Sequence, residues 1–153
     1  MELTFTARLM VAVPLREVAQ EVVDKRKVTK YNENTGKPYK KELRSNPRVV
    51  LGSLSVKGQI EDFNRILDLE TAIKESGSSL ELVFVKWSLG CEINQFYLAR
   101  VIACTDGYSG DGASVVKIRE DKIAKEIEAF NKAIKKLGIP KCKPMIYLHR
   151  DIE

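Results

Sequence analysis

The stretch from residue 27 to residue 44, KVTKYNENTGKPYKKELR, contains almost no side chain that could fill a hydrophobic core. Its polar residues alternate, and the ENTGK segment inside it has the form of a three-residue hairpin loop flanked by Glu33 and Lys37. Such a loop combines a type I turn with a glycine in the left-handed region. The stretch therefore predicts a β-hairpin that protrudes from the body of the fold.

The loop also sets the register that we expect for this hairpin. It places Tyr31 opposite Tyr39 on one face and Lys30 opposite Lys40 on the other. Like charges directly opposite each other destabilise a strand pair, and an isolated two-stranded ribbon is only marginally stable. We therefore expect the hairpin either to lean on the body through its tyrosines or to be ordered by an anionic partner.

The positive charge of the protein gathers in the same part of the chain. The 153 residues include 26 Lys and Arg and 21 Asp and Glu, with a formal net charge of +5. Residues 25–48 hold nine basic and two acidic side chains, a net charge of +7, and the remaining residues have a net charge of −2. A local patch of this kind argues for a partner surface.

Nucleic acid is the first hypothesis for that partner. Basic side chains bind phosphate oxygens and release counterions, a two-stranded ribbon fits the major groove of B-DNA, and aromatic side chains can stack on exposed bases. The sequence therefore predicts a non-enzymatic binding protein. The expected contact residues are Lys27, Lys30, Tyr31, Lys37, Tyr39, Lys40, Lys41, Arg44 and Arg48.

Two other interpretations of the hairpin stay open. In the first, it docks on an acidic surface of a larger protein or nucleoprotein assembly, as an interaction or inhibitor module. In the second, its lysines only keep an exposed strand edge from aggregating. The sequence does not distinguish DNA from RNA, indicates no sequence preference and leaves the oligomeric state open.

A third hypothesis for the whole protein is a metal-dependent enzyme that uses the glycine-rich stretch TDGYSGDGAS, residues 105–114. Asp106 and Asp111 lie there, and paired carboxylates can hold a catalytic metal. Aspartate in such a segment is explained more simply as a turn former, so we expect a flexible loop. We expect no catalytic residue, no metal ligand and no cofactor.

The cysteines and the single histidine give no catalytic signal either. The spacing of Cys91, Cys104 and Cys142 fits no disulfide or zinc pattern. Cys104 lies in the apolar run ARVIAC and is expected to be buried as a small hydrophobic residue. His149 is expected at the surface near the end of a strand.

The remaining sequence predicts a single α+β domain over residues 1–153. Residues 3–13 alternate between apolar and polar side chains, and residues 118–137 have apolar side chains at steps of three and four. The other expected strands are 48–56, 80–88, 95–104 and 143–149, and the other expected helices are 14–23 and 59–75. This order favours one mixed or mostly antiparallel sheet with about three helices packed on it.

Two absences bear on where the protein resides. No apolar run approaches the roughly 18 residues that a membrane span needs. The first residues, MELTFTARLMVAV, lack the basic segment and the continuous apolar segment of a signal peptide. We therefore expect a cytoplasmic protein that does not contact a membrane.

Overall fold

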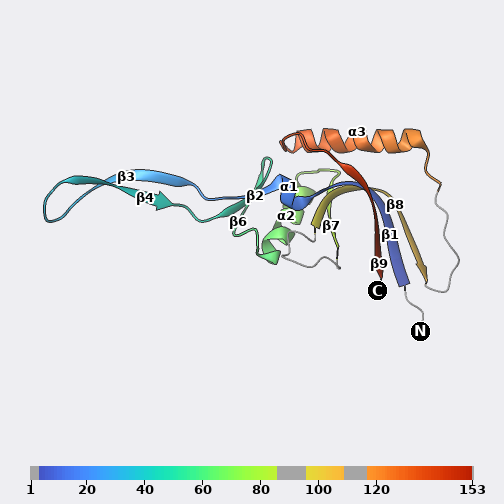
Figure 1. Cartoon of the computed structure of the whole chain (residues 1–153), viewed down its shortest axis with the longest axis horizontal. Coiled ribbons are helices and arrows are strands. Elements are labelled where there is room, and N and C mark those ends of the chain that lie inside the picture. Colours follow the sequence, from blue (N-terminus) through green and yellow to red (C-terminus); the bar gives the residue numbers. More distant parts are fainter. Residues whose placement is uncertain (1–3, 86–95, 109–116, 153) are drawn as a thin grey trace.

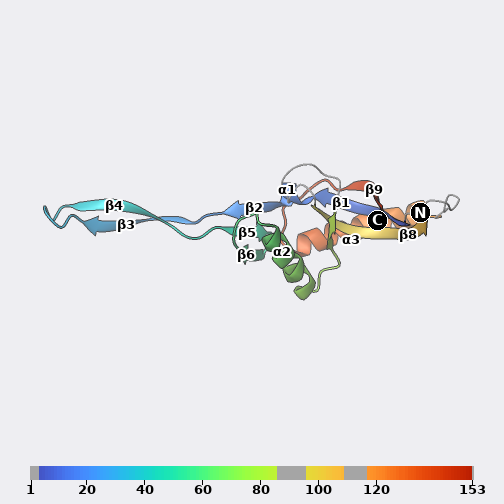
Figure 2. The same cartoon turned by 90° about the horizontal axis from the view of Figure 1, so that it is seen from below.

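The computed structural model describes residues 4–85, 96–108 and 117–152 (Figure 1). Within these ranges the chain forms a single α+β domain with three helices and antiparallel sheets, which confirms the predicted fold class. A two-stranded ribbon extends far from the body along the longest axis of the molecule (Figures 1 and 2).

A four-stranded antiparallel sheet with the strand order β7-β8-β1-β9 forms the body. Its strands are β1 (Thr4–Pro14), β7 (Glu81–Phe84), β8 (Phe96–Tyr108) and β9 (Met145–Ile152). β1 confirms the strand expected over residues 3–13, but from Met10 to Val13 the strand is buried on both faces rather than on one. β9 forms one edge of this sheet and the shorter β7 forms the other.

The helices of the described ranges are α1 (Leu15–Val18), α2 (Phe63–Glu75) and α3 (Glu120–Lys136). α3 lies across one face of the sheet (Figure 1), where its buried Phe130 and Ile134 join the same core cluster as Val11 and Leu98. α2 begins later than the expected residue 59, because the Asp62 side chain caps the helix by accepting a hydrogen bond from the Asn64 amide.

A β-bulge in β8 changes the position of Cys104. The register of β1 against β8 shifts between Leu9 and Met10, which leaves Ile102 as an extra residue. Because the extra residue reverses the alternation of side chains, Cys104 lies on the face of the sheet opposite to α3 and is exposed. The prediction that Cys104 is buried is therefore wrong.

The prediction for His149 is also wrong, since this side chain is buried. β9 continues to Ile152, so His149 lies inside the strand, opposite Arg8 of β1. The guanidinium Nη1 of Arg8 donates a hydrogen bond to His149 Nδ1 at 3.5 Å.

The glycine-rich stretch 105–114 is not wholly a loop. Its first residues, Thr105 to Tyr108, belong to β8 and pair with β1, so Asp106 lies opposite Thr6 in a strand pair. Asp111 and Cys91 lie outside the described residues.

A second antiparallel sheet with the order β2-β5-β6 connects the body to the ribbon. Its strands are β2 (Ala19–Val22), β5 (Arg48–Leu51) and β6 (Leu54–Lys57). The helix expected over 14–23 is therefore only one turn long, because residues 19–22 pair with β5 instead of continuing it.

The single strand expected over 48–56 is a hairpin. Gly52, with φ 59°, and Ser53 form the two-residue turn between β5 and β6. A glycine at the first central position is the signature of a type II′ turn, which matches the twist of a strand pair. The Gly-Ser pair between two apolar runs was the sequence signal for this turn.

A basic arm as the candidate partner interface

The ribbon consists of β3 (Lys25–Tyr31) and β4 (Pro38–Arg44), which pair with each other in a separate antiparallel sheet. We call residues 25–44 the arm. Each strand has seven residues and spans about 23 Å at the usual rise of about 3.3 Å per residue. Every strand residue of the arm is exposed except the half-buried Val28 and Leu43. The arm therefore presents almost all of its side chains to solvent.

The predicted register of the arm is wrong by one residue. Lys30 lies opposite Tyr39, and Tyr31 lies opposite Pro38. The Asn32 amide donates to the Lys37 carbonyl at 2.9 Å, so the connecting loop comprises the four residues 33–36 rather than three.

The side chain of Asn32 stabilises this longer loop. Its Oδ1 atom accepts hydrogen bonds from the backbone amides of Asn34 at 2.8 Å and Thr35 at 3.2 Å. The Asn32 carbonyl accepts from the Gly36 amide at 2.8 Å, and Gly36 closes the loop with φ 67°. An asparagine that bonds to the amides two and three residues ahead is a common turn device, and Asn32 was the signal that the sequence offered.

The shift of one residue redistributes the side chains between the two faces of the arm. Tyr31 and Tyr39 lie on opposite faces, so the predicted tyrosine pair does not form. The face with Tyr31 carries Lys25, Lys27, Lys40, Glu42 and Arg44, and the face with Tyr39 carries Arg26, Val28, Lys30, Lys41 and Leu43. Each face therefore has a net charge of +3.

Most of the positive charge on the arm has no internal acid partner. Glu42 lies 3.9 Å from the Lys25 ammonium and 3.7 Å from the Arg44 guanidinium, and exposed pairs of this kind contribute only about 0 to 1 kcal/mol. The lysines that form no ion pair with any described residue are Lys27, Lys30, Lys37, Lys40 and Lys41. Their ammonium groups are available to an external anion.

Arg48 lies at the root of the arm, on β5, and not on the arm itself. Its guanidinium forms an ion pair with Asp24 at 3.5 Å. Asp24 and Ser45 close the root, since the Ser45 amide donates to the Asp24 carbonyl at 2.9 Å and the Ser45 hydroxyl accepts from the Asp24 amide at 3.1 Å. The structure thus places eight of the nine predicted contact residues on the arm and Arg48 beside it.

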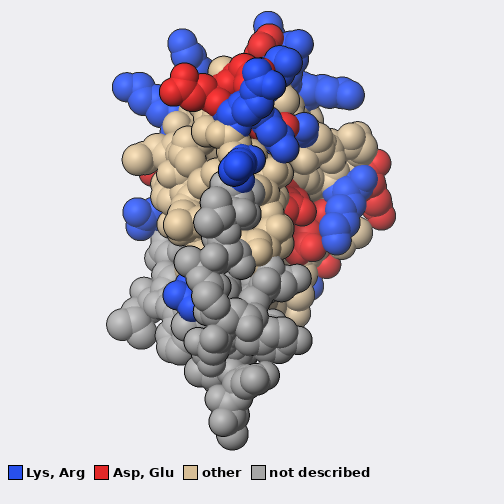
Figure 3. Space-filling view, turned by 90° about the vertical axis from the view of Figure 1, so that its right-hand side faces the viewer, with Lys and Arg blue, Asp and Glu red and all other residues tan. Residues whose placement is uncertain are grey.

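The body shows no comparable concentration of one charge sign on the face that Figure 3 displays. In that view, from the end of the molecule away from the arm, basic and acidic side chains mix over α3. The contacts behind this mixture include Lys132 with Glu128 at 3.9 Å and Arg119 with Asp121 at 3.3 Å.

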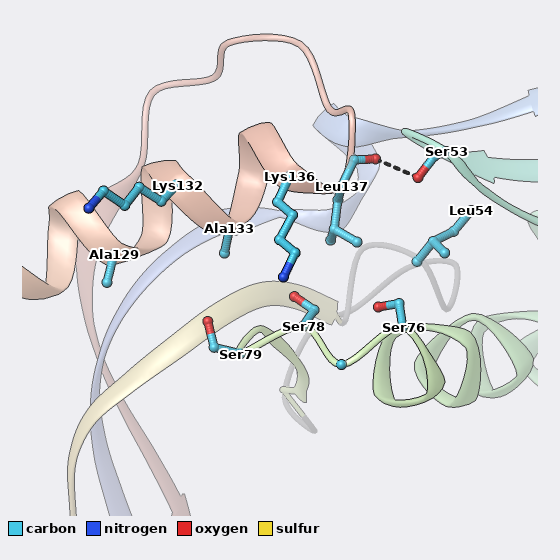
Figure 4. A pocket seen from close by; sticks show the side chains of 11 residues that line it. Ser53, Leu54, Ser76, Ser78, Ser79, Ala129, Lys132, Ala133, Lys136 and Leu137 are labelled. Carbon is cyan, nitrogen blue, oxygen red and sulfur yellow. Dashed lines mark hydrogen bonds between the residues drawn. The ribbon is translucent and has the colours of Figure 1, made fainter.

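A pocket of about 390 Å³ lies between α3, the β5–β6 turn and the α2–β7 connection (Figure 4). The carboxyl ends of α2 and α3 both meet it, and the Lys136 side chain points toward Ser78. The hydroxyls of Ser53 and Ser76 are occupied by backbone carbonyls, at 3.0 and 2.6 Å. We interpret the pocket as a structural junction, in which a lysine complements the negative ends of two helix dipoles.

The described residues contain no group of three or more His, Cys, Asp or Glu side chains that could hold a metal ion. Burial, and to a smaller degree the carboxylate of Glu17, raises the pKa of Cys142, which favours the thiol over the nucleophilic thiolate. None of the described helices combines the length and the apolar composition needed to cross a membrane.

The chemistry of the arm is therefore the main basis for inferring a function. Comparisons of the chain with protein-family models, with curated proteins and with solved structures find no match.

Proposed function

We propose that this protein is a non-enzymatic binding protein whose arm contacts nucleic acid. One observation carries the proposal: five lysines without an acid partner among the described residues gather on a narrow ribbon that stands away from the body (Figure 2). Holding like charges together in this way is unfavourable for the free protein and becomes favourable when an anion binds between them.

One spacing between charges on the arm suits a phosphate backbone. Lys25 and Lys27 are the one pair of basic side chains in successive positions on a face of either arm strand, and such positions lie about 6.7 Å apart. Each strand of B-DNA carries one charge per about 3.4 Å of helix axis, so this spacing corresponds to two nucleotide steps. Carboxylates on an acidic protein surface have no fixed spacing, so the match at Lys25 and Lys27 supports nucleic acid as the partner.

The equal charge of the two faces indicates how the arm engages its partner. A ribbon that laid one face on a flat anionic surface would need basic side chains on that face only. A net charge of +3 on each face suits insertion between two anionic walls, as in the major groove, which admits a two-stranded ribbon. Tyr31 and Tyr39, 67% and 49% exposed, would then meet the nucleic acid from both faces near the tip.

Fluorescence anisotropy with labelled single- and double-stranded oligonucleotides tests the proposal. The arm variant combines Lys30→Gln, Lys37→Gln, Lys40→Gln and Lys41→Gln. A body control with the same charge change combines Lys122→Gln, Lys125→Gln, Lys132→Gln and Lys135→Gln on α3.

We expect micromolar or tighter binding at low salt, a loss of at least tenfold in the arm variant, and a change below twofold in the body control. An absence of binding at low salt would overturn the proposal and direct the search to an acidic protein partner. Equal losses in the two variants would show that the charge of the whole protein, rather than the arm, attracts the oligonucleotide.

A further inference from the structure

The outer edge of β9 is open to pairing. β9 forms the end of the strand order β7-β8-β1-β9, and in the described part of the chain it pairs with β1 alone. It has eight residues, which is longer than most strands. A long open edge is a template for another strand.

The side chains of β9 leave apolar surface exposed beside this edge. Met145, Ile146 and Leu148 are 61%, 43% and 76% exposed. Ile146 and Leu148 lie opposite Val11 and Leu9, on the side of the sheet that α3 covers. α3 packs on β8 and β1 and leaves these two side chains uncovered.

The central part of the edge, residues 145–148, also lacks the usual protection against pairing. Proteins place lysines or prolines on edges that must stay unpaired, and both strands of the arm carry lysines. Residues 145–148, Met-Ile-Tyr-Leu, carry no charge. This difference between the arm strands and residues 145–148 indicates that another strand covers the β9 edge.

We propose that two copies of this chain pair through β9, antiparallel and about a twofold axis at Tyr147. In this register Ile146 lies opposite Leu148 of the second copy, and Leu148 lies opposite the second copy's Ile146. The exposed aliphatic side chains then cover each other on one face, and the two four-stranded sheets become one continuous sheet of eight strands. Opposed apolar pairs of this kind stabilise antiparallel strands.

Charge favours a second copy as the occupant. In the sequence, Lys141 and Lys143 precede β9, and its other end carries Arg150, Asp151 and Glu153, with a net charge of −1, so the segment is basic at its start and weakly acidic at its finish. In the register centred on Tyr147, Lys143 lies opposite Asp151 of the second copy. The segment is thus complementary to itself, which is what an isologous twofold interface requires.

The dimer would separate the two arms. β1 runs from the body toward the root of the arm, and the arm continues in the same general direction (Figure 2). Because a twofold axis at β9 reverses the strand direction, the arms project from opposite ends of the dimer. Pairing through β9 leaves both arms free whatever they bind.

Sedimentation velocity of the full chain over about 1 to 200 μM tests the pairing. The contact of two strand edges is small, so we expect a dissociation constant in the micromolar range. Leu148→Lys should raise it by at least tenfold, and Leu67→Lys, at a 41% exposed position on α2, should leave it unchanged. A monomer at every concentration, or a dimer insensitive to Leu148→Lys, would overturn the proposal.

A charge exchange tests the register. Lys143→Glu and Asp151→Lys should each weaken self-association, because each variant opposes like charges at both ends of the interface. An equimolar mixture of the two variants should associate more strongly than either alone, because unlike charges then face each other at both ends. A mixture that associates no better than its components would contradict the antiparallel arrangement. Circular dichroism checks that each variant is folded.

Discussion

Tyr31 and Tyr39 lie on opposite faces of the arm, because Tyr31 stands opposite Pro38 and Tyr39 stands opposite Lys30. Each tyrosine therefore shares its face with a separate group of basic side chains. The arm has two faces of similar composition, each with one tyrosine and a net charge of +3, rather than one basic face and one aromatic face.

If both faces meet phosphates, neutralising either one should weaken binding by a similar amount. The variant Lys25→Gln, Lys27→Gln, Lys40→Gln changes the face of Tyr31, and the variant Arg26→Gln, Lys30→Gln, Lys41→Gln changes the face of Tyr39. We expect dissociation constants within about threefold of each other, both at least tenfold weaker than the wild type. A loss confined to one variant would show that the arm lies flat on its partner.

The tyrosines should matter most for single strands, whose bases are free to stack. Tyr31→Ala and Tyr39→Ala should each cost about 1 to 3 kcal/mol of binding to a single-stranded oligonucleotide. Because the two rings lie on opposite faces, their effects should be additive in the double variant. Both positions are exposed, so the thermal unfolding midpoint of the body should stay within error of the wild type.

The loop of the arm should depend on the side chain of Asn32. Asn32→Ala removes the acceptor of two backbone amides and should cost the arm about 1 kcal/mol locally. The NMR cross-strand contacts between Lys30 and Tyr39 should weaken, while those between β1 and β8 remain. Thr35→Ala is the control, because its hydroxyl accepts a single longer bond of 3.4 Å from the Lys37 amide.

Gly52 in the β5–β6 turn should be more sensitive to substitution than Gly77. A Cβ on Gly52 would lie 2.2 Å from the Leu137 carbonyl oxygen, which also accepts the Ser53 amide at 2.8 Å. Gly77 has φ 76°, and no atom lies within 4 Å of a Cβ added there. Gly77→Ala should therefore lower the free energy of unfolding only by the strain of an alanine at positive φ, about 1 to 2 kcal/mol. Gly52→Ala should cost about 1 to 3 kcal/mol more, since the turn must move. Urea unfolding of the two variants would show the difference, and equal losses would contradict this packing.

The thiol of Cys142 should react slowly with iodoacetamide. Burial first, and then the carboxylate of Glu17, raises its pKa above the ordinary value of 9.0. A raised folded-state pKa contributes stability that is complete below pH 9.0 and is lost as pH rises through the folded-state value. Peptide-resolved mass spectrometry at pH 8 should find the exposed Cys104 alkylated before Cys142. Faster labelling of Cys142 would contradict the burial of its thiol.

The sequence was most informative where one pattern determined the structure. The apolar steps over 118–137 predicted α3 within two residues at each end, because an amphipathic stripe has only one stable position on a sheet. The structure also forms a hairpin in the segment where the sequence predicts one, since a segment with so few apolar side chains contributes little to a core. The face of the arm on which each side chain lies could not be predicted. One extra residue in the loop shifts the register by one, which changes which side chains of the two strands share a face.

The failures in the body share a physical cause. Residues 19–22 pair with β5, and Ile102 is the extra residue of a bulge, and both features depend on partners distant in the sequence. Local periodicity does not carry that information. The long-range pairing of β1 and β9 likewise placed His149 inside a strand rather than at its end.

The salt dependence of binding tests the central claim, that arm lysines contact phosphates, most directly. The affinity of the wild type and of the variant Lys30→Gln, Lys37→Gln, Lys40→Gln, Lys41→Gln would be measured for one duplex across a range of salt concentrations. Each lost phosphate contact reduces the slope of log affinity against log salt by about 0.9, so the four substitutions should reduce it by about 3.6. Parallel lines for the two proteins, with the same slope, would contradict the claim.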